Sequence, residues 1–496
     1  MNGLADNLPV LPVILLLLSA YLMPTIARFR PRWCAPLATF ATGCSTLGAV
    51  ALAARVLLTG QPVEYSVGGW NPPWGIGLRI GYPEVFMLLV LNGVCVAILA
   101  YTIADISHEL PPKAVGWYYT IFLLLLAAMS GIVMAHDLFN LYVFMEVSGI
   151  AACALVCAKG SRESVVAALK YLFLAAIGSG FVLFAIGMLY LLTGQLNVGY
   201  AAAELAQVWS AYPRVLWVVI SFFIVGFGVK SALFPLHVWL PDAHASAPSP
   251  SSAILSGLVV KVYAFALIRL FCTVLAEPLA LSGMREEVRF ILLAMAVMAI
   301  VGGSLFALVQ SDVKRLLAYS TVAQIGYIFL GFGLGTRTAV TAALLHVLFH
   351  ALMKSGLFLS AGAIALRTGA RSVAGYDGMG RRMPLSMGVF TVCALSMIGL
   401  PGFSGLITKW YLGSAIIAAG YPLLLLVLVA STLLNTLYYL PVLGRAYQGP
   451  AAERAVEAPA AMLVPMLVLG GLTILFGFWP SLPLALAGKA ARVLIP

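Results

Sequence analysis

The segment GFGVKSALFPLHVWLPDAH, residues 226–244, places a lysine and two prolines within a long apolar stretch. Pro235 has no backbone N–H, so it is expected to break or kink a helix one turn after Lys230, and Pro241 is expected to help end that helix. A broken helix at membrane depth is tolerated only where it lines protein or water. The segment therefore predicts a buried, interrupted membrane helix that carries Lys230.

The composition around this segment is that of a polytopic membrane protein. The chain has 496 residues, of which 62% are hydrophobic and 9% charged, and its mean hydropathy is +1.04. A soluble protein carries about a quarter charged residues, so that class is excluded. Segments of about 20 apolar residues cross a bilayer, and they must be helical because an open sheet leaves backbone groups unpaired in lipid.

About 14 such spans are predicted, which makes this an all-α polytopic membrane protein. The spans are 9–27, 36–59, 84–106, 116–134, 138–158, 165–193, 214–240, 250–275, 288–309, 315–334, 339–366, 386–413, 422–446 and 460–480. Residues 1–7 lack a basic region, so the first span is expected to be retained rather than cleaved as a signal peptide.

The distribution of basic side chains predicts the orientation. With both termini outside, inner connecting segments hold 14 Lys and Arg residues and outer ones hold 8. Because positive charge concentrates on the inner side, this excess favours both termini outside a bacterial inner membrane. The net charge of +11 is then explained mostly by basic residues that mark the inner side of the membrane. No nucleic-acid partner is expected.

Several charged residues lie inside the predicted spans. A charge at mid-bilayer costs at least about 2.5–3.5 kcal/mol, so these side chains should face protein or a wet cavity rather than lipid. Arg269 is weaker evidence for such a sheltered environment, because its long side chain can reach the outer surface. Among the acids, only Glu146 is expected well inside a span. The six basic residues are Lys170, Lys230, Lys261, Arg269, Lys354 and Lys409.

Glu146 lies in the fifth span, in HDLFNLYVFMEVSG, and Lys230 is its natural partner. Burial disfavours either charge alone, whereas an opposite charge favours both. Such a pair can act as a switch, because separating the charges allows the lysine to release its proton. The alternative is a static buried ion pair. Asp137, in the same segment, and His237, near Lys230, are secondary candidates.

The eleventh span carries LLHVLFHALMKSGLF, in which His346, His350 and Lys354 are spaced four apart and share one helical face. A metal site would need acids, and only the distant Glu146 is available in the membrane. A proton relay fits better than a metal site or packing histidines, because histidine titrates near neutral pH. Lys261 and Lys170 are expected as intermediate steps.

A second interrupted span, IGLPGFSGLITKWYL, places Pro401 shortly before Lys409. Two broken helices, each with a lysine, indicate two inverted five-helix repeats, spans 4–8 and 9–13. The alternative is that these Pro and Gly residues indicate no repeat, because both residue types are common in membrane helices. The predicted units are the N-terminal helices of residues 1–115, a first repeat 116–275, a second repeat 288–446 and a C-terminal helix 460–496.

No cofactor or metal is expected. The sequence contains no phosphate-binding GxxxxGK[ST] loop, no haem motif and no iron–sulfur ligand set. Cys153 and Cys157 are one turn apart, which could suggest a metal, but small buried residues at a helix contact are the better interpretation. Energy must therefore come from an ion gradient or from partner subunits.

Four motifs carry a resemblance to a known family. They are GVKSALFPLHVWLPDAHASAPSPSSAILSGLVVK, QSDVKRLLAYSTVAQIGYI, LLHVLFHALMKSGLF and GLPGFSGLITKW. In this order, within about residues 100–445, they resemble the antiporter-like subunits shared by respiratory complex I, membrane-bound hydrogenases and Mrp-type cation/proton antiporters. The resemblance implies fourteen helices with inverted repeats and a chain of proton-carrying residues.

The resemblance also implies roles for individual residues. Glu146 and Lys230 would form the switch, Lys261 the central lysine, and His350 with Lys354 the relay in the eleventh span. The final position is a lysine in some subunits and a glutamate in others. Here it is Lys409, which disfavours the complex I subunit type that uses glutamate.

The segment YSVGGWNPPWGIGL, residues 65–78, resembles the D-type subunit of Mrp antiporters. The chain ends about sixteen residues after its last span, without the long lateral helix of the largest complex I subunit. The favoured function is therefore a non-enzymatic, proton-translocating subunit of a multi-subunit Na⁺/H⁺ antiporter, with other membrane subunits, protons and monovalent cations as partners. The alternative is a proton-pumping, non-redox subunit of a complex I-type NADH:quinone oxidoreductase or membrane-bound hydrogenase. A purely structural scaffold is disfavoured by the buried titratable groups.

Overall fold

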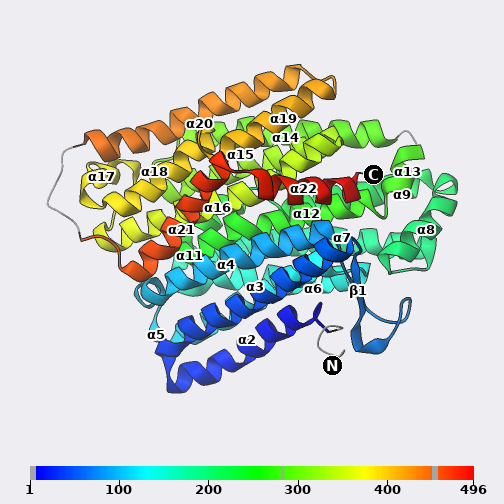
Figure 1. Cartoon of the computed structure of the whole chain (residues 1–496), viewed down its shortest axis with the longest axis horizontal. Coiled ribbons are helices and arrows are strands. Elements are labelled where there is room, and N and C mark those ends of the chain that lie inside the picture. Colours follow the sequence, from blue (N-terminus) through cyan, green and yellow to red (C-terminus); the bar gives the residue numbers. More distant parts are fainter. Residues whose placement is uncertain (1–6, 282–283, 450–455, 496) are drawn as a thin grey trace.

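The computed structural model describes residues 7–281, 284–449 and 456–495 and is almost entirely helical. Long helices lie side by side along one direction, with a β-hairpin at one end of the bundle (Figure 1). The hairpin pairs β1 (Val63–Ser66) with β2 (Gly77–Ile80) in antiparallel register, from Val63 opposite Ile80 to Ser66 opposite Gly77.

The fourteen predicted spans are confirmed as helical elements. Thirteen helices in the described residues are long and apolar enough to cross a membrane, and the twelfth predicted span consists of two shorter helices. The first six spans are α2 (Leu11–Phe29), α3 (Cys34–Thr59, after η1 Pro31–Trp33), α4 (Tyr82–Glu109), α5 (Pro112–Met134), α6 (Leu138–Val156, followed by η3 Cys157–Lys159) and α7 (Arg162–Thr193). The seventh is α9 (Pro213–Lys230) with α10 (Leu240–Ser246), and the eighth is α11 (Ser249–Ile254), the π-helical η5 (Leu255–Val259) and α12 (Val260–Cys272).

The remaining spans follow in the predicted order. They are α14 (Met284–Leu308), α15 (Val313–Leu334), α16 (Arg337–Thr368), α18 (Pro384–Ile398) with α19 (Ser404–Ala418), α20 (Leu423–Gln448) and α21 (Ala460–Phe478). Short elements connect them: η2 (Val67–Gly69), α8 (Val198–Val208), η4 (Trp209–Ala211), α13 (Ala276–Leu281), η6 (Val373–Tyr376) and α17 (Met379–Arg382). The final helix, α22 (Ser481–Leu494), packs against α4 and α16.

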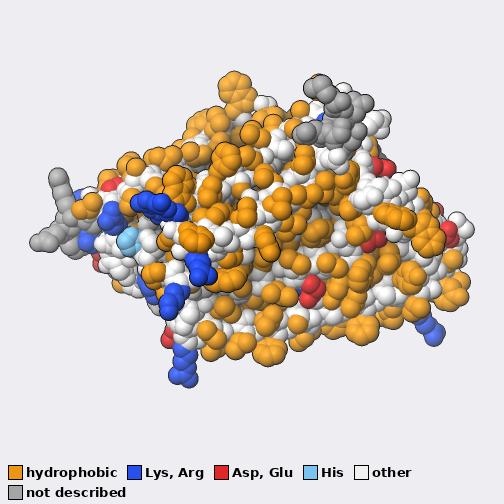
Figure 2. Space-filling model, turned by 90° about the horizontal axis from the view of Figure 1, so that it is seen from below, with side chains coloured by type: hydrophobic (Ala, Val, Ile, Leu, Met, Phe, Trp, Pro, Cys, Tyr) orange, Lys and Arg blue, Asp and Glu red, His pale blue; other side chains and the backbone are white. Residues whose placement is uncertain are grey.

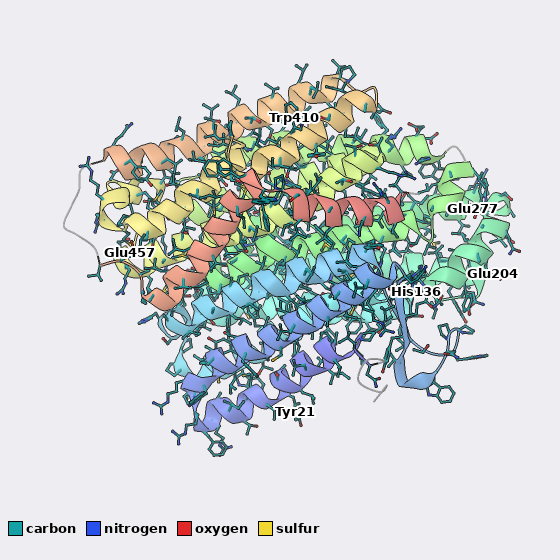
Figure 3. All side chains as sticks on the ribbon, in the orientation of Figure 1. Tyr21, His136, Glu204, Glu277, Trp410 and Glu457 are labelled. Atoms are coloured by element: carbon teal, nitrogen blue, oxygen red, sulfur yellow. The ribbon has the colours of Figure 1, made fainter. Side chains whose placement is uncertain are left out.

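Burial separates central helices from peripheral ones. In the most apolar stretch of the eighth span 100% of the residues are buried, and in those of α15 and α16 94% are buried. In the corresponding stretches of α2 and α20 only 28% of the residues are buried. The outer surface is largely apolar, and charged side chains gather toward its two ends (Figure 2). Tyr21 and Trp410 project from opposite edges of the bundle (Figure 3). The eighth, tenth and eleventh spans therefore form the protein interior in which charged groups can be sheltered from lipid.

The seventh span is broken as predicted, although the prolines act differently from the expectation. Helix α9 ends at Lys230 and Ala232 has a positive φ of 55°. Pro235 therefore lies inside the break rather than at the helix end. Pro241 was expected to help end the helix, but it lies in the first turn of α10, where the missing N–H costs nothing.

The twelfth span is broken at Gly399–Phe403, around Pro401, as predicted. Gly399 and Gly402 have φ values of 92° and 87°, which favour glycine. A Cβ on Gly405 would lie 1.8 Å from the backbone oxygen of Ser396, so the two half-helices approach each other closely only because this residue is glycine.

The two predicted repeats share several features. Their third helices, α7 and α16, each have 32 residues. An isolated antiparallel bridge joins the residue before the second helix to a segment after the third one in both units, Asp137 to Asn197 and Asp312 to Ser372. These matches support the internal repeat, whose boundaries and inversion stay predictions.

Both ends of the described chain lie at the hairpin end of the bundle (Figure 1). The Tyr65 hydroxyl of the hairpin donates to the Asn7 side chain at 2.8 Å. Val493 and Leu494, at the other end of the chain, line a cavity with Gly60 and Arg79 from the hairpin region. This agrees with an even number of spans, and which side of the membrane this end faces stays a prediction.

Candidate functional site: a line of buried lysines

The structure brings Glu146 and Lys230 together, as predicted. The Lys230 Nζ lies 3.6 Å from a Glu146 carboxylate oxygen, and their side chains are 2% and 32% exposed. This distance is within ion-pair range but longer than a normal hydrogen bond. Lys230 is held at the C-terminal end of α9, where the negative end of the helix dipole favours a cation.

A glycine and two residues with hydroxyl groups, none of which the sequence analysis singled out, surround this pair. A Cβ on Gly149 would lie 2.7 Å from the Lys230 Nζ, so only glycine leaves room for the lysine to approach α6. The Lys230 Nζ also lies 5.8 Å from the centre of the Tyr263 ring, and the Tyr263 hydroxyl is 2.6 Å from that of Ser148. Tyr263 connects the pair to the eighth span.

Lys261 lies fully inside the protein, directly after the π-helical turn η5. The Val260 N–H bonds to the Leu255 oxygen five residues earlier, and the Lys261 ammonium donates to the Ser256 oxygen. Such π-turns occur frequently at functional sites because they release backbone groups from the regular helix ladder. Within the described residues Lys261 has no carboxylate partner at ion-pair distance.

Hydroxyl and carbonyl groups connect Lys261 with Lys354. The Ser256 hydroxyl lies 2.7 Å from that of Thr321, and Thr321 donates to the Leu317 oxygen at 2.9 Å. The Lys354 ammonium donates to the same Leu317 oxygen at 2.8 Å. The two predicted lysines are therefore separated by a short series of polar groups from α15.

The two histidines of the eleventh span extend this line toward Lys409. The His346 and His350 rings stack with centres 5.3 Å apart and planes 8° apart. The Tyr327 ring lies 5.2 Å from His346 on one side and 5.8 Å from the Lys409 Nζ on the other. Tyr327, which the sequence analysis did not identify, fills the gap between the relay and the last lysine.

Lys409 spans the break of the twelfth span. It lies on α19, but its ammonium donates to the oxygen of Ile398, the last residue of α18, at 2.6 Å. It also donates to the Thr432 hydroxyl of α20 at 2.8 Å. A lysine at this place satisfies an unpaired carbonyl and complements the negative end of the half-helix.

Three secondary candidates lie away from this line. Lys170 was expected within a span, but its side chain is 57% exposed and pairs with Asp242 at 2.8 Å, because it lies only two turns after the start of α7. The His237 ring packs against Phe234 at 4.8 Å within the break. Asp137 caps α6, accepting from the Asn140 N–H at 2.8 Å, as N-terminal aspartates commonly do.

Two expectations about charged residues were wrong. Arg269 does not reach the outer surface: it is buried, pairs with Glu84 at 3.6 Å and donates to the backbone oxygens of residues 132, 133 and 135 at the end of α5. Glu146 is also not the only acid inside a span. Asp105 is fully buried and Glu84 nearly so, because α4 begins and ends beyond the predicted span.

His136, next to the Arg269 contact, is another titratable group that the sequence analysis missed. It lies in the short connection between α5 and α6. Burial, together with the positive charges of Arg79 and Arg269, lowers the pKa of His136 to about 4. The imidazole is therefore neutral at physiological pH.

The described residues contain no cluster of three or more His, Cys, Asp or Glu side chains that could hold a metal ion. What the arrangement provides is a set of ammonium, imidazole and hydroxyl groups inside the protein. Such groups can pass protons between neighbours without a cofactor.

Comparison with known proteins places this arrangement in a family. Residues 135–435 match the family described as NADH:quinone oxidoreductase/Mrp antiporter, transmembrane region. The chain belongs to this family. The matched segment contains every residue of the line from Glu146 to Lys409.

Individual relatives come from both kinds of complex. The N subunit of the NADH-quinone oxidoreductase of Desulforudis audaxviator is 40% identical over 95% of this chain and 96% of its own length. The D subunit of the Na⁺/H⁺ antiporter of Alkalihalophilus pseudofirmus is 29% identical over 95% and 94%. A chain of the membrane-bound sulfane sulfur reductase, an archaeal respiratory membrane complex, superposes with a TM-score of 0.91 at 31% identity, covering 98% of this chain and 97% of its own. The relatives thus favour the respiratory alternative over the Mrp interpretation drawn from residues 65–78.

Proposed function

We propose that this chain is a proton-translocating membrane subunit of a complex I-type respiratory assembly. It performs no redox chemistry itself and is driven by electron transfer in partner subunits. The observation that carries the proposal is the line Glu146, Lys230, Lys261, His350–Lys354 and Lys409. In the part of the chain that the structure describes, the last three lysines are held only by carbonyl and hydroxyl oxygens. A proton can leave each of them without breaking an ion pair.

The proton path follows the order of contacts. Approach of the Glu146 carboxylate stabilises the charged form of Lys230, and its withdrawal favours proton release. The proton then passes through Lys261, the Lys354 and histidine pair, and leaves near Lys409. Each lysine alternates between ammonium and amine as its neighbour gains or loses a proton, so charge moves along the line of lysines.

Substitution of the switch pair tests the path. Glu146→Gln and Lys230→Met keep side-chain size but remove the charge, so proton translocation should fall at least tenfold while the assembly still forms. Proton uptake by vesicles containing the tagged complex measures translocation, and co-purification of partners measures assembly. Glu204→Gln, on the exposed surface of α8 at the hairpin end (Figure 3), is the matched control. Wild-type translocation in both switch variants would refute the proposal.

A second function, a subunit of an Mrp-type Na⁺/H⁺ antiporter, is favoured by the relative from Alkalihalophilus pseudofirmus and by residues 65–78, which form the hairpin and its loop. Mass spectrometry of the purified complex separates the two. Quinone reductase or other redox subunits in the complex support the respiratory function. Small antiporter subunits, together with Na⁺-dependent proton release from vesicles, support the Mrp function instead.

A further inference from the structure

An apolar groove lies on the surface of the bundle, between α4, α16 and the last two helices of the chain. Helix α21 ends at Phe478 and α22 follows from Ser481, and both pack against α4 and α16 (Figure 1). The groove that these helices leave has a volume of about 240 Å³. Every described residue that lines it is apolar or glycine, and all four helices contribute: Phe86, Gly93 and Ala97 of α4, Leu352 of α16, Leu472 of α21 and Leu486 of α22.

The length of the groove matches one leaflet of a bilayer. Along α4 its lining extends from Phe86 to Ala97, which is about 16 Å at the helical rise of 1.5 Å per residue. Half of the hydrocarbon core of a bilayer is about 15 Å thick. Gly93 and Val468 of the lining are exposed, and a Cβ on Gly93 would meet nothing within 4 Å. The groove is therefore open to surrounding lipid and long enough for one extended hydrocarbon chain.

A positively charged side chain lies at the hairpin end of the groove. Lys489 follows the lining residue Leu486 by one turn of α22. Its Nζ lies 5.4 Å from the centre of the Tyr82 ring, and Tyr82 precedes the lining residue Phe86 by one turn of α4. Lys489 is exposed, and within the described residues no carboxylate lies at ion-pair distance from it. Arg492, one turn further along α22, is also exposed and adds positive charge.

This arrangement of charge and apolar surface favours a phospholipid over other occupants. A helix of a partner subunit, about 10–12 Å across, is too wide for a groove of about 240 Å³ that extends over this length. An uncharged isoprenoid tail fits the groove but leaves the ammonium of Lys489 without a counter-charge. An anionic phospholipid supplies both parts, because its phosphate pairs with a lysine at the membrane surface while its acyl chain lies below.

We propose that this groove holds one acyl chain of an anionic phospholipid, whose phosphate lies at Lys489. Tyr82 stands beside the phosphate, at the boundary between apolar and polar surroundings where tyrosine is favoured. The chain then packs against Leu348 and Leu352 of α16. At 100° per residue these two leucines lie on the face of α16 opposite to Lys354. The lipid thereby supports the relay helix from behind without taking part in proton transfer.

A phosphatidylglycerol probe with a photoreactive group on its acyl chain tests the site in the intact purified complex reconstituted in vesicles. After illumination, mass spectrometry should find crosslinks in peptides that contain residues 86–97 and 468–486. Gly93→Leu fills the open part of the groove, and Lys489→Gln removes the charge at its end. Each variant should lower crosslinking to these peptides at least fivefold.

Two matched controls separate the groove from general effects of the substitutions. Gly471→Leu changes an exposed glycine of α21 that lies outside the groove, where a Cβ also meets nothing within 4 Å. Arg214→Gln removes an exposed positive charge at the start of α9. Both controls should crosslink as the wild type does. The same probe built on phosphatidylcholine, which has no net charge, should label the groove at least fivefold less than phosphatidylglycerol.

Equal labelling by the two lipids, or wild-type labelling of Lys489→Gln, would overturn the anionic head group. A wild-type complex without crosslinks in the groove would overturn the site as a whole, whether a partner subunit covers the groove or no lipid enters it. Should Gly93→Leu fail to assemble, Lys489→Gln and the comparison of the two lipids decide the matter. The readout is binding rather than translocation, so it stands or fails independently of the proposed function.

Discussion

Gly149 determines how closely Lys230 can approach α6. A Cβ at this position would lie only 2.7 Å from the Lys230 ammonium, closer than two such atoms can approach, and the ammonium lies 3.6 Å from the Glu146 carboxylate. The absence of a side chain at one position thus sets the separation of the two charges.

Gly149→Ala should therefore weaken the switch without removing either charge. The added methyl group pushes the Lys230 ammonium away, and translocation should fall about tenfold, the effect of ~1.4 kcal/mol on a barrier. Vesicle proton uptake measures this. Gly180→Ala on α7, where a Cβ meets nothing within 4 Å, should leave the rate unchanged, and an unaffected Gly149→Ala variant would show that the separation is not critical.

At the scale of single residues, the sequence predicted which charged residues lie within the helices better than it predicted which groups they contact. Charged side chains in apolar segments are visible directly, and Lys230, Lys261 and Lys354 are indeed buried. Lys170 and Arg269 were misplaced because the sequence does not show which groups they meet: Lys170 pairs with Asp242, and Arg269 donates to backbone oxygens at the end of α5. Tyr327 could not be found, since a single aromatic residue in an apolar helix has no distinctive spacing.

Helix breaks are the elements that shape the site. Each break leaves carbonyl groups without partners, and side chains satisfy them: the Trp239 indole donates to the Val229 oxygen at 2.8 Å, and Lys409 donates to Ile398. Prolines and glycines predicted both breaks. The π-turn before Lys261 was not predictable, because its residues, Leu255–Val259, have the pattern of an ordinary apolar helix.

The closeness of the half-helices at the second break makes Gly405 intolerant of any side chain. Gly405→Ala should destabilise the protein by about 1–3 kcal/mol, the usual range for overpacking, because its Cβ would lie 1.8 Å from the Ser396 oxygen. Thermal unfolding of the purified complex in detergent measures the change. Gly413→Ala on the same helix meets only ordinary contacts at 3.7 Å and should be neutral; equal stability of the two variants would contradict the close packing.

For the whole molecule, the sequence predicted the number of spans and the line of residues across the centre, because hydropathy and intramembrane charge are strong signals. It did not predict which contacts hold the helices together at the hairpin end of the bundle. There, Glu84 of α4, Arg269 of α12 and the backbone at the end of α5 meet next to His136. The contacts join residues far apart in the chain and leave no local pattern.

This end of the molecule should be sensitive to acid. The pKa of His136 is lowered to about 4, so the folded state resists a proton that the unfolded chain accepts near its ordinary pKa of about 6.5. The contribution of His136 to stability should be constant above about pH 6.5 and fall as the pH decreases toward 4. His136→Asn should lose less thermal stability than the wild type between pH 7 and pH 5. An identical loss in both proteins would assign the acid sensitivity to other groups.

Because Lys409 donates a hydrogen bond to the last carbonyl of α18, its protonation state affects how firmly α18 and α19 are held together. While the lysine is charged, it holds α19 to the negative end of the other half-helix across the break that contains Gly399 and Gly402, both with positive φ. Once it gives up its proton, that tie keeps a hydrogen bond but loses its electrostatic strength. The contact between α18 and α19 therefore weakens at the moment a proton departs. The last step of the path thus couples the charge of Lys409 to the strength with which the two half-helices are held together.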